Sequence, residues 1–171
     1  MTATPRGNGT PTGTSTGTSG GTPTGTSGGT PTGTSTGTSA SLPDVDAFTR
    51  PYWDAAAEGH LLLRHCTACD RPHHYPREFC PHCWSEAVEW RRASGRAVLY
   101  TWSVVHRNDL PPFGGRVPYV AAVVDLAEGP RMMTEIVDCP ESGLRIGMDL
   151  DVAFRAEGDV QVPVFTPRRS R

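Results

Sequence analysis

Four of the five cysteines in this 171-residue chain form two Cys-x-x-Cys motifs, with ten residues between them from Asp70 to Phe79. A gap of two residues lets both sulfurs of one motif reach the same cation, and two such motifs supply the four thiolates that a structural zinc ion prefers. We therefore predict a zinc ribbon. Its predicted metal ligands are Cys66, Cys69, Cys80 and Cys83.

Other uses of these cysteines fit the sequence less well. Two disulfides are disfavoured because the polar N-terminus is not an export signal, and a redox dithiol needs only one such motif inside a βαβ pattern that is missing here. Iron in a rubredoxin-like site is the less favoured occupant of the same four ligands. With four protein ligands the site has no open coordination position, so it is predicted to be structural rather than catalytic.

Four histidines lie in or near the two motifs, and one further cysteine lies outside them. Imidazole also binds zinc, but with four cysteines at ideal spacing we expect the histidines to hydrogen-bond or shield the rim of the site. Cys139 has no spacing partner and is expected to be a lone reduced thiol. The histidines near the motifs are His65, His73, His74 and His82.

A short helix and two short strands are predicted to position the cysteines. The helix should run from Arg50 to Gly59, with Thr49 as N-cap and Gly59 as the stop signal. One apolar face of this helix is expected to consist of Trp53, Ala56 and Ala57, with Tyr52 beside them. The apolar run of residues 60–65 enters the first motif, and residues 88–91 leave the second as a strand.

Five further segments are rich in β-branched and aromatic residues and are separated by turn residues. They predict a mainly β domain, for which a five-stranded OB-fold barrel fits best and a five-stranded sandwich is the alternative. Tyr100 and Trp102 are expected in the barrel core. The long Pro- and Gly-rich loop 107–118 is expected to carry binding function. The five predicted strands are residues 97–106, 119–126, 131–137, 149–155 and 160–165.

The sequence divides into three parts. Residues 1–43 are almost only Gly, Thr, Ser and Pro, with Gly-Thr-Pro-Thr-Gly-Thr-Ser recurring from Gly9, Gly21 and Gly29, and are predicted to be a disordered tether. Residues 44–93 are predicted to form the helix and zinc ribbon, and residues 94–171 the barrel.

Charge and hydropathy exclude several function classes. The net charge is −2 and all 16 basic residues are arginines without a basic patch, which argues against binding to duplex nucleic acid. No apolar run reaches the roughly 18 residues of a membrane span. We expect a cytoplasmic protein, and we find no catalytic triad, carboxylate pair or phosphate-binding glycine loop.

The order of these parts resembles a known family. The carrying segments are the helix with Pro51-Tyr-Trp-Asp-Ala-Ala56, the two cysteine motifs, Val88-Glu-Trp90 and the strand Ser94–Arg107. Together they are similar to the OB-fold proteins with an N-terminal rubredoxin-like zinc ribbon that are associated with acyl-CoA metabolism. The resemblance extends from Phe48 to Pro167 and leaves out the N-terminal segment.

The resemblance implies a subunit that is not catalytic by itself. Members of this family partner thiolase-like enzymes, including the aldolases that shorten steroid side chains as CoA thioesters, so the complex would be a carbon-carbon lyase or an acyltransferase. The ribbon and helix would dock on the enzyme and the barrel would lie near the acyl-CoA entrance. The acyl-CoA contacts that this implies are Arg107, Arg116 and Tyr119. Arginine side chains suit CoA phosphates and an aromatic ring suits its adenine, for which Tyr100 and Trp102 are available as the alternative to a place in the core.

Two other functions remain open from the sequence. Zinc ribbons and OB-folds both occur in proteins that bind single-stranded nucleic acid, although the acidic balance of this chain argues against that function. The other is a stand-alone enzyme or an electron carrier, for which iron in the four-cysteine site would show as colour and a visible absorption band, whereas zinc is silent.

Overall fold

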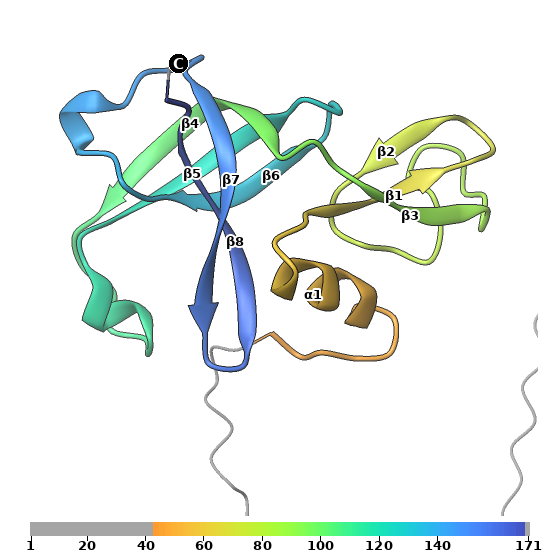
Figure 1. Cartoon of the computed structure of the whole chain (residues 1–171), viewed down its shortest axis with the longest axis horizontal. Helices are drawn as coiled ribbons and strands as arrows, with labels where there is room; N and C mark the ends of the chain where they lie inside the picture. The colour runs from red at the N-terminus through yellow and green to blue at the C-terminus, as the bar shows by residue number, and fades with distance from the viewer. Residues whose placement is uncertain (1–42, 170–171) are drawn as a thin grey trace, which may run out of the picture. The chain divides into compact units, whose positions relative to one another are not determined.

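The computed structural model describes residues 43–169, which belong to one compact unit. The predicted tether therefore lies, except for Pro43, outside the described residues. Figure 1 labels the helix α1 and the strands β1 to β8. With the two short 3-10 helices η1 and η2, the elements follow along the chain in this order: α1 Arg50–Ala57, β1 Leu62–Cys66, β2 Arg71–His73, β3 Val88–Arg92, β4 Arg96–Val105, η1 Phe113–Arg116, β5 Tyr119–Leu126, β6 Arg131–Ile136, η2 Glu141–Gly143, β7 Asp149–Glu157 and β8 Val160–Pro167.

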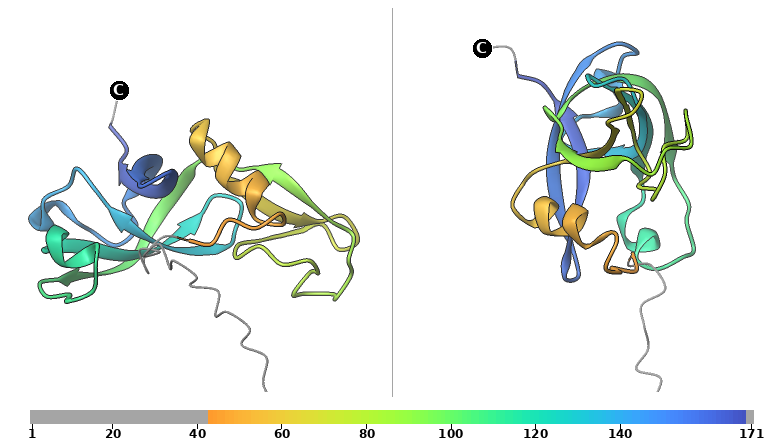
Figure 2. Two further views of the ribbon diagram at one scale, coloured as in Figure 1. Left: turned by 90° about the horizontal axis from the view of Figure 1, so that it is seen from below. Right: turned by 90° about the vertical axis from the view of Figure 1, so that its right-hand side faces the viewer.

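Strands β4 to β8 form a closed barrel in the order β4-β5-β6-β8-β7. Strand β7 pairs with β4 and completes the circle, and β6 meets β8 in parallel at Ile136 and Phe165, whereas all other neighbours are antiparallel. Figure 2 shows the barrel from two further sides. This five-stranded closed barrel confirms the predicted OB-fold and excludes the open sandwich.

Alternating side chains fill the barrel. On β5 the buried residues are every second one, from Val120 to Leu126, and Leu99, Leu150 and Phe165 are completely buried. Strand β4 changes its inward face at a bulge between Leu99 and Thr101. The bulge leaves Tyr100 44% exposed, so its predicted place in the core is wrong, whereas Trp102 packs partly buried against the core.

Strands β1, β2 and β3 form the sheet of the ribbon, with β1 in the centre and antiparallel neighbours on both sides (Figure 1). Strands β1 and β3 correspond to the predicted segments on either side of the cysteine motifs. Strand β2, which contains Pro72, was not predicted because three residues are too few for a periodic pattern.

Helix α1 begins and ends nearly as predicted, but its cap differs. The Thr49 hydroxyl does not cap the helix and instead donates to Asp46 Oδ1 at 2.8 Å, while the same oxygen accepts the Thr49 N–H at 2.6 Å. Gly59 adopts a φ of +77° just beyond the helix, in the left-handed region that suits a stop signal.

The buried face of α1 is narrower than predicted. Tyr52 and Ala56 are buried and Trp53 is partly buried, but Ala57 is exposed. Helix α1 contacts both β1 and β8 (Figure 2), and Tyr52 shares one hydrophobic cluster with Leu63 and Phe165. The ribbon, the helix and the barrel are therefore joined by a continuous core. Within residues 43–169, no helix combines the length and the apolar character needed to cross a membrane.

Candidate metal centre and apolar cleft

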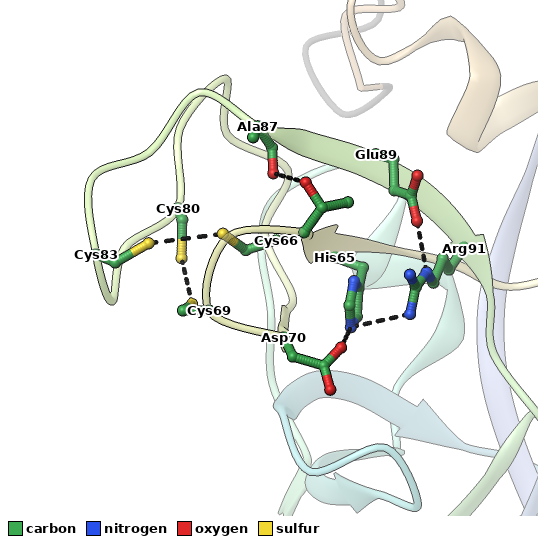
Figure 3. A network of polar contacts seen from close by, with 10 residues as sticks. His65, Cys66, Cys69, Asp70, Cys80, Cys83, Ala87, Glu89 and Arg91 are labelled. Atoms are coloured by element: carbon green, nitrogen blue, oxygen red, sulfur yellow. Dashed lines mark hydrogen bonds and ion pairs between the residues drawn. The ribbon is translucent and has the colours of Figure 1, made fainter.

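The four predicted cysteines come together at one end of the ribbon (Figure 3). Cys66 ends β1, Cys69 lies in the turn to β2, and Cys80 and Cys83 lie in the loop before β3. Their sulfurs lie within 4.8 Å of one another, and the pairs Cys66–Cys83 and Cys69–Cys80 are each separated by 3.6 Å. A tetrahedron with metal–sulfur bonds of about 2.3 Å has edges of about 3.8 Å, so the four sulfurs fit a tetrathiolate metal ion and are too far apart for disulfides.

The proton affinities of these thiols agree with a cation site. Burial would raise the pKa of Cys80, but the backbone N–H groups of His82 and Cys83 outweigh it and lower that pKa to about 7. Burial and the neighbouring thiols raise the pKa of Cys69 to about 12. Four thiolates this close repel one another, so the cluster needs a divalent cation to become fully deprotonated. The residues present fit that cation.

Both cysteine motifs end in the same backbone turn. The residues that follow them, Asp70 and Trp84, have φ values of 56° and 62° in the left-handed region. In the second motif, the N–H of Trp84 donates to the carbonyl of Cys80 at 2.9 Å and the N–H of Cys80 donates to the carbonyl of Ser85 at 2.9 Å. These bonds fix the loop around the sulfurs independently of any side chain.

The nearby histidines do not belong to the cysteine cluster found among the described residues. His65 is buried beside it, and its Nε2 lies 3.1 Å from both Asp70 Oδ1 and Arg91 Nη1, where it either donates to the carboxylate or accepts from the guanidinium (Figure 3). His73 is buried opposite Arg64, and burial lowers its pKa. His82 is exposed. The side chain of His65 thus lies between the loop of Asp70 and β3.

A second feature is an apolar cleft of about 400 Å³ between α1, residues 74–76 and the barrel. Aromatic and aliphatic side chains form most of its walls. They include Tyr52, Trp53, Tyr75, Phe113, Tyr119 and Met132. Its size and its mainly apolar walls are typical of a site for an apolar small-molecule group.

A row of four alternating charges borders this cleft. Arg155 pairs with Glu135 at 2.8 Å and with Glu157 at 3.4 Å, and the same Glu157 oxygen pairs with Arg116 at 2.8 Å. All four side chains are at most 27% exposed. The guanidinium of Arg116 also lies 5.1 Å from the centre of the Phe113 ring. The row holds the loop containing η1 against β7.

The three residues predicted to contact acyl-CoA lie in different surroundings. Tyr119 lines the cleft and its hydroxyl accepts a hydrogen bond from Asn108 at 3.0 Å. Arg116 does not line the cleft, but its guanidinium lies over the ring of Phe113, which does. The side chain of Arg107 is 85% exposed and pairs with Asp109 at 3.3 Å, and it does not line the cleft. Sequence reasoning missed Glu157 and Arg155, whose only signal was their place at the end of a strand with alternating polarity.

Two family models match consecutive parts of the chain. The model described as the rubredoxin-like zinc ribbon domain of ChsH2 matches residues 53–89. The model described as the C-terminal OB-fold domain of ChsH2 matches residues 90–155. The boundary between the two models lies within β3.

The names of the curated relatives describe two kinds of protein, hydratase subunits and scaffold proteins. A probable enoyl-CoA hydratase alpha subunit from Thermomonospora curvata is 33% identical over 117 residues, which make up 68% of this chain but only 36% of that protein. A DUF35 domain-containing scaffold protein from Methanocaldococcus jannaschii is 36% identical over 105 residues, covering 60% of this chain and 74% of the relative. The chain therefore spans about a third of the hydratase subunit and most of the scaffold protein.

Solved structures share the fold. The chain matches the structure called Ltp2-ChsH2(DUF35) aldolase with a TM-score of 0.65 and 31% identity, over 74% of this chain and 98% of that one. A DUF35 protein of unknown function from Sulfolobus solfataricus matches with a TM-score of 0.52 at 12% identity, which supports the fold alone.

Proposed function

This chain belongs to the DUF35 family, in the form with a ChsH2-type zinc ribbon and OB-fold, and on that premise we propose that it is an accessory subunit of a thiolase-like enzyme. The enzyme would be an acyl-CoA thiolase or a steroid side-chain aldolase. The observation that carries the proposal is the match to 98% of the ChsH2(DUF35) aldolase chain at 31% identity.

The names of other relatives support a CoA thioester as the substrate of the complex. A relative from Mycobacterium tuberculosis, 29% identical over 122 residues, is called a 3-oxo-4,17-pregnadiene-20-carboxyl-CoA hydratase alpha subunit. The names given above describe hydratase subunits, scaffold proteins and an aldolase, so they do not support the nucleic-acid alternative.

We assign a structural zinc ion to the four cysteines of the ribbon. The zinc would be held by Cys66, Cys69, Cys80 and Cys83, whose sulfurs have the spacing of a tetrathiolate site. Zinc supplies a fixed tetrahedral centre, and these four thiolates would hold the two loops of the ribbon against each other. Reduced thiols are maintained in the cytoplasm, which is the compartment that we propose. Elemental analysis of the purified chain should give about one zinc per chain and no visible absorption band from iron.

We propose that the apolar cleft helps to receive the acyl thioester. Its aromatic walls suit an apolar acyl group, and Arg116 beside it could approach a CoA phosphate from the Phe113 side. Arg107, exposed on the same loop, could reach a phosphate farther along the ligand. Tyr119 would contact the part of the ligand inside the cleft.

Two experiments test these proposals. Co-expression with thiolase-like proteins from the same genome should give a stable complex whose cleavage or condensation activity exceeds that of either protein alone. Failure to form a complex with any of them would overturn the accessory role. In the complex, Arg116→Gln should weaken binding of a CoA thioester measured by calorimetry, whereas Arg131→Gln, on an arginine that pairs with Asp125 away from the cleft, should not. Equal affinities of these two variants would contradict the assigned contact.

A further inference from the structure

Trp84 presents the largest apolar side chain on the surface of the ribbon. It directly follows Cys83, and its side chain is 74% exposed, the highest value among the large hydrophobic residues exposed in the described part of the chain. The loop of Cys83 lies at the outer end of the metal centre (Figure 3). Burial of a tryptophan side chain stabilises a folded protein, but Trp84 is exposed and does not stabilise the core of the free chain.

The backbone of Trp84 is held in an unfavourable conformation. Its φ of 62° lies in the left-handed region, which costs a residue with a side chain about 1–2 kcal/mol and costs glycine almost nothing. The hydrogen bond from its N–H to the Cys80 carbonyl enforces this conformation. Glycine would therefore stabilise this turn better than tryptophan in the chain alone, which indicates that the indole ring is used in contact with another molecule.

The indole ring is also preorganised. The ring of Phe79 stacks on it with centroids 5.4 Å apart and an interplanar angle of 19°. The stack restricts the indole before any partner arrives, which reduces the entropy lost on binding. Tryptophan residues fixed in this way are typical of the few positions that dominate the affinity of a protein interface.

Two carboxylates lie beside Phe79, one of the two stacked rings. A hollow in the surface is lined by Glu78, Phe79 and Glu86, and neither glutamate forms an ion pair with another residue in the range 43–169. Two free carboxylates beside an aromatic face suit an arginine, which can pair with the carboxylates and lie over the ring. The same two charges repel the phosphates of a nucleic acid, so a base stacked on Trp84 is disfavoured.

We propose that Trp84, stacked on Phe79 next to the hollow that Phe79 shares with Glu78 and Glu86, is the anchor by which the ribbon docks on its enzyme partner, at a surface that presents an arginine beside an apolar pocket. This inference rests on the proposed accessory function. Beyond that function, it names the residues that make the contact and the chemistry that the partner surface must offer. Residues around the apolar cleft take no part in it.

The test uses the full chain in complex with its thiolase-like partner. Trp84→Gly removes the ring and relieves the backbone, so the variant should keep its metal and melt at the same or a higher temperature. Its dissociation constant for the partner should rise by about 30-fold or more, as expected when a dominant interface tryptophan is lost. The matched control is Ile146→Ser, which changes a side chain that is 72% exposed on the barrel and should leave the affinity unchanged.

A second variant tests the charges. Changing both Glu78→Gln and Glu86→Gln keeps the shape of the hollow, and it should slow association and reduce the dependence of affinity on salt. Unchanged association rates in this variant would refute the arginine contact.

The outcomes separate the two proposals. If the wild-type chain forms the complex and the dissociation constant of Trp84→Gly is within about twofold of the wild-type value, the assignment of Trp84 as the anchor is wrong while the accessory function stands. If the wild-type chain binds no thiolase-like protein, the accessory function fails and the anchor fails with it. Loss of self-association instead of partner binding in Trp84→Gly, seen by sedimentation, would assign the ring to a second copy of this chain and would also overturn the proposal.

Discussion

Replacing Cys80 by serine is expected to unfold the ribbon while the barrel stays folded. The three strands of the ribbon bury only one aliphatic side chain, Leu63. The other buried positions of these strands carry Arg64, His65, Cys66 and His73. The ribbon therefore has almost no apolar core of its own, and its order depends on the metal centre.

The free energies contributed by apolar burial and by metal binding decide which part unfolds. Burial of one leucine contributes about 2 kcal/mol, whereas a structural zinc bound by cysteines contributes on the order of 10 kcal/mol to a small metal module. The barrel, in contrast, completely buries Leu99, Val124, Leu150 and Phe165 around its own closed sheet. Loss of the metal therefore removes the main stabilising contribution from β1–β3 and leaves the contribution that stabilises β4–β8.

Hydrogen exchange followed by mass spectrometry measures this difference. In Cys80→Ser, or after chelation of the wild-type metal, amides of β1–β3 should lose protection while those of β4–β8 keep it. The control is Cys139→Ser, because the Cys139 sulfur lies outside the four-cysteine cluster; its exchange and metal content should match the wild type. Retained protection of β1–β3 without metal would refute the reasoning, and so would simultaneous loss of protection in the barrel.

Three further predictions concern the barrel and the cleft. Gly95→Ala should lower the free energy of unfolding by about 2 kcal/mol in urea denaturation. The reason is that Gly95 has a φ of +76° and the new Cβ would lie 2.6 Å from Val152 Cγ1. The control is Gly115→Ala, whose new Cβ would have no atom within 4 Å, and it should leave the free energy of unfolding almost unchanged. Glu157→Gln should cost about 1–2 kcal/mol, because Arg116 and Arg155 share one of its oxygens; a thermal melt equal to the wild type would contradict the shared pair. Burial lowers the pKa of His74 from 6.5 to about 4, so the unfolded chain binds more protons between these values and stability falls as the pH decreases through this range. From about pH 7 to about pH 5 the wild type should lose about 2 kcal/mol more than His74→Gln in denaturant titrations, and equal losses would show that His74 is not the group responsible.

Local patterns in the sequence determined much of this protein. The spacing of the four cysteines predicted their convergence, because two residues between ligands fix the local reach of each motif. The β-branched and aromatic content of residues 119–126 predicted β5. The alternation along residues 149–155 predicted β7, because the side-chain period of a strand is two. Five strands separated by turn residues and one long loop were sufficient to predict the barrel.

The tertiary structure decided the features that depend on pairing between distant segments. The bulge in β4 reverses which residues face the core, and it placed Tyr100 outside, under the guanidinium of Arg131 at 3.6 Å. Glu157 pairs with Arg116, which lies 41 positions away in the sequence. The cleft joins side chains from α1, the ribbon, η1 and four strands of the barrel. Periodicity within a segment reports which face is buried, but it carries no information about which other segment covers that face. The sequence by itself thus determined that the four cysteines converge, and only the packing of α1 and residues 74–76 against the barrel decided where the apolar cleft lies.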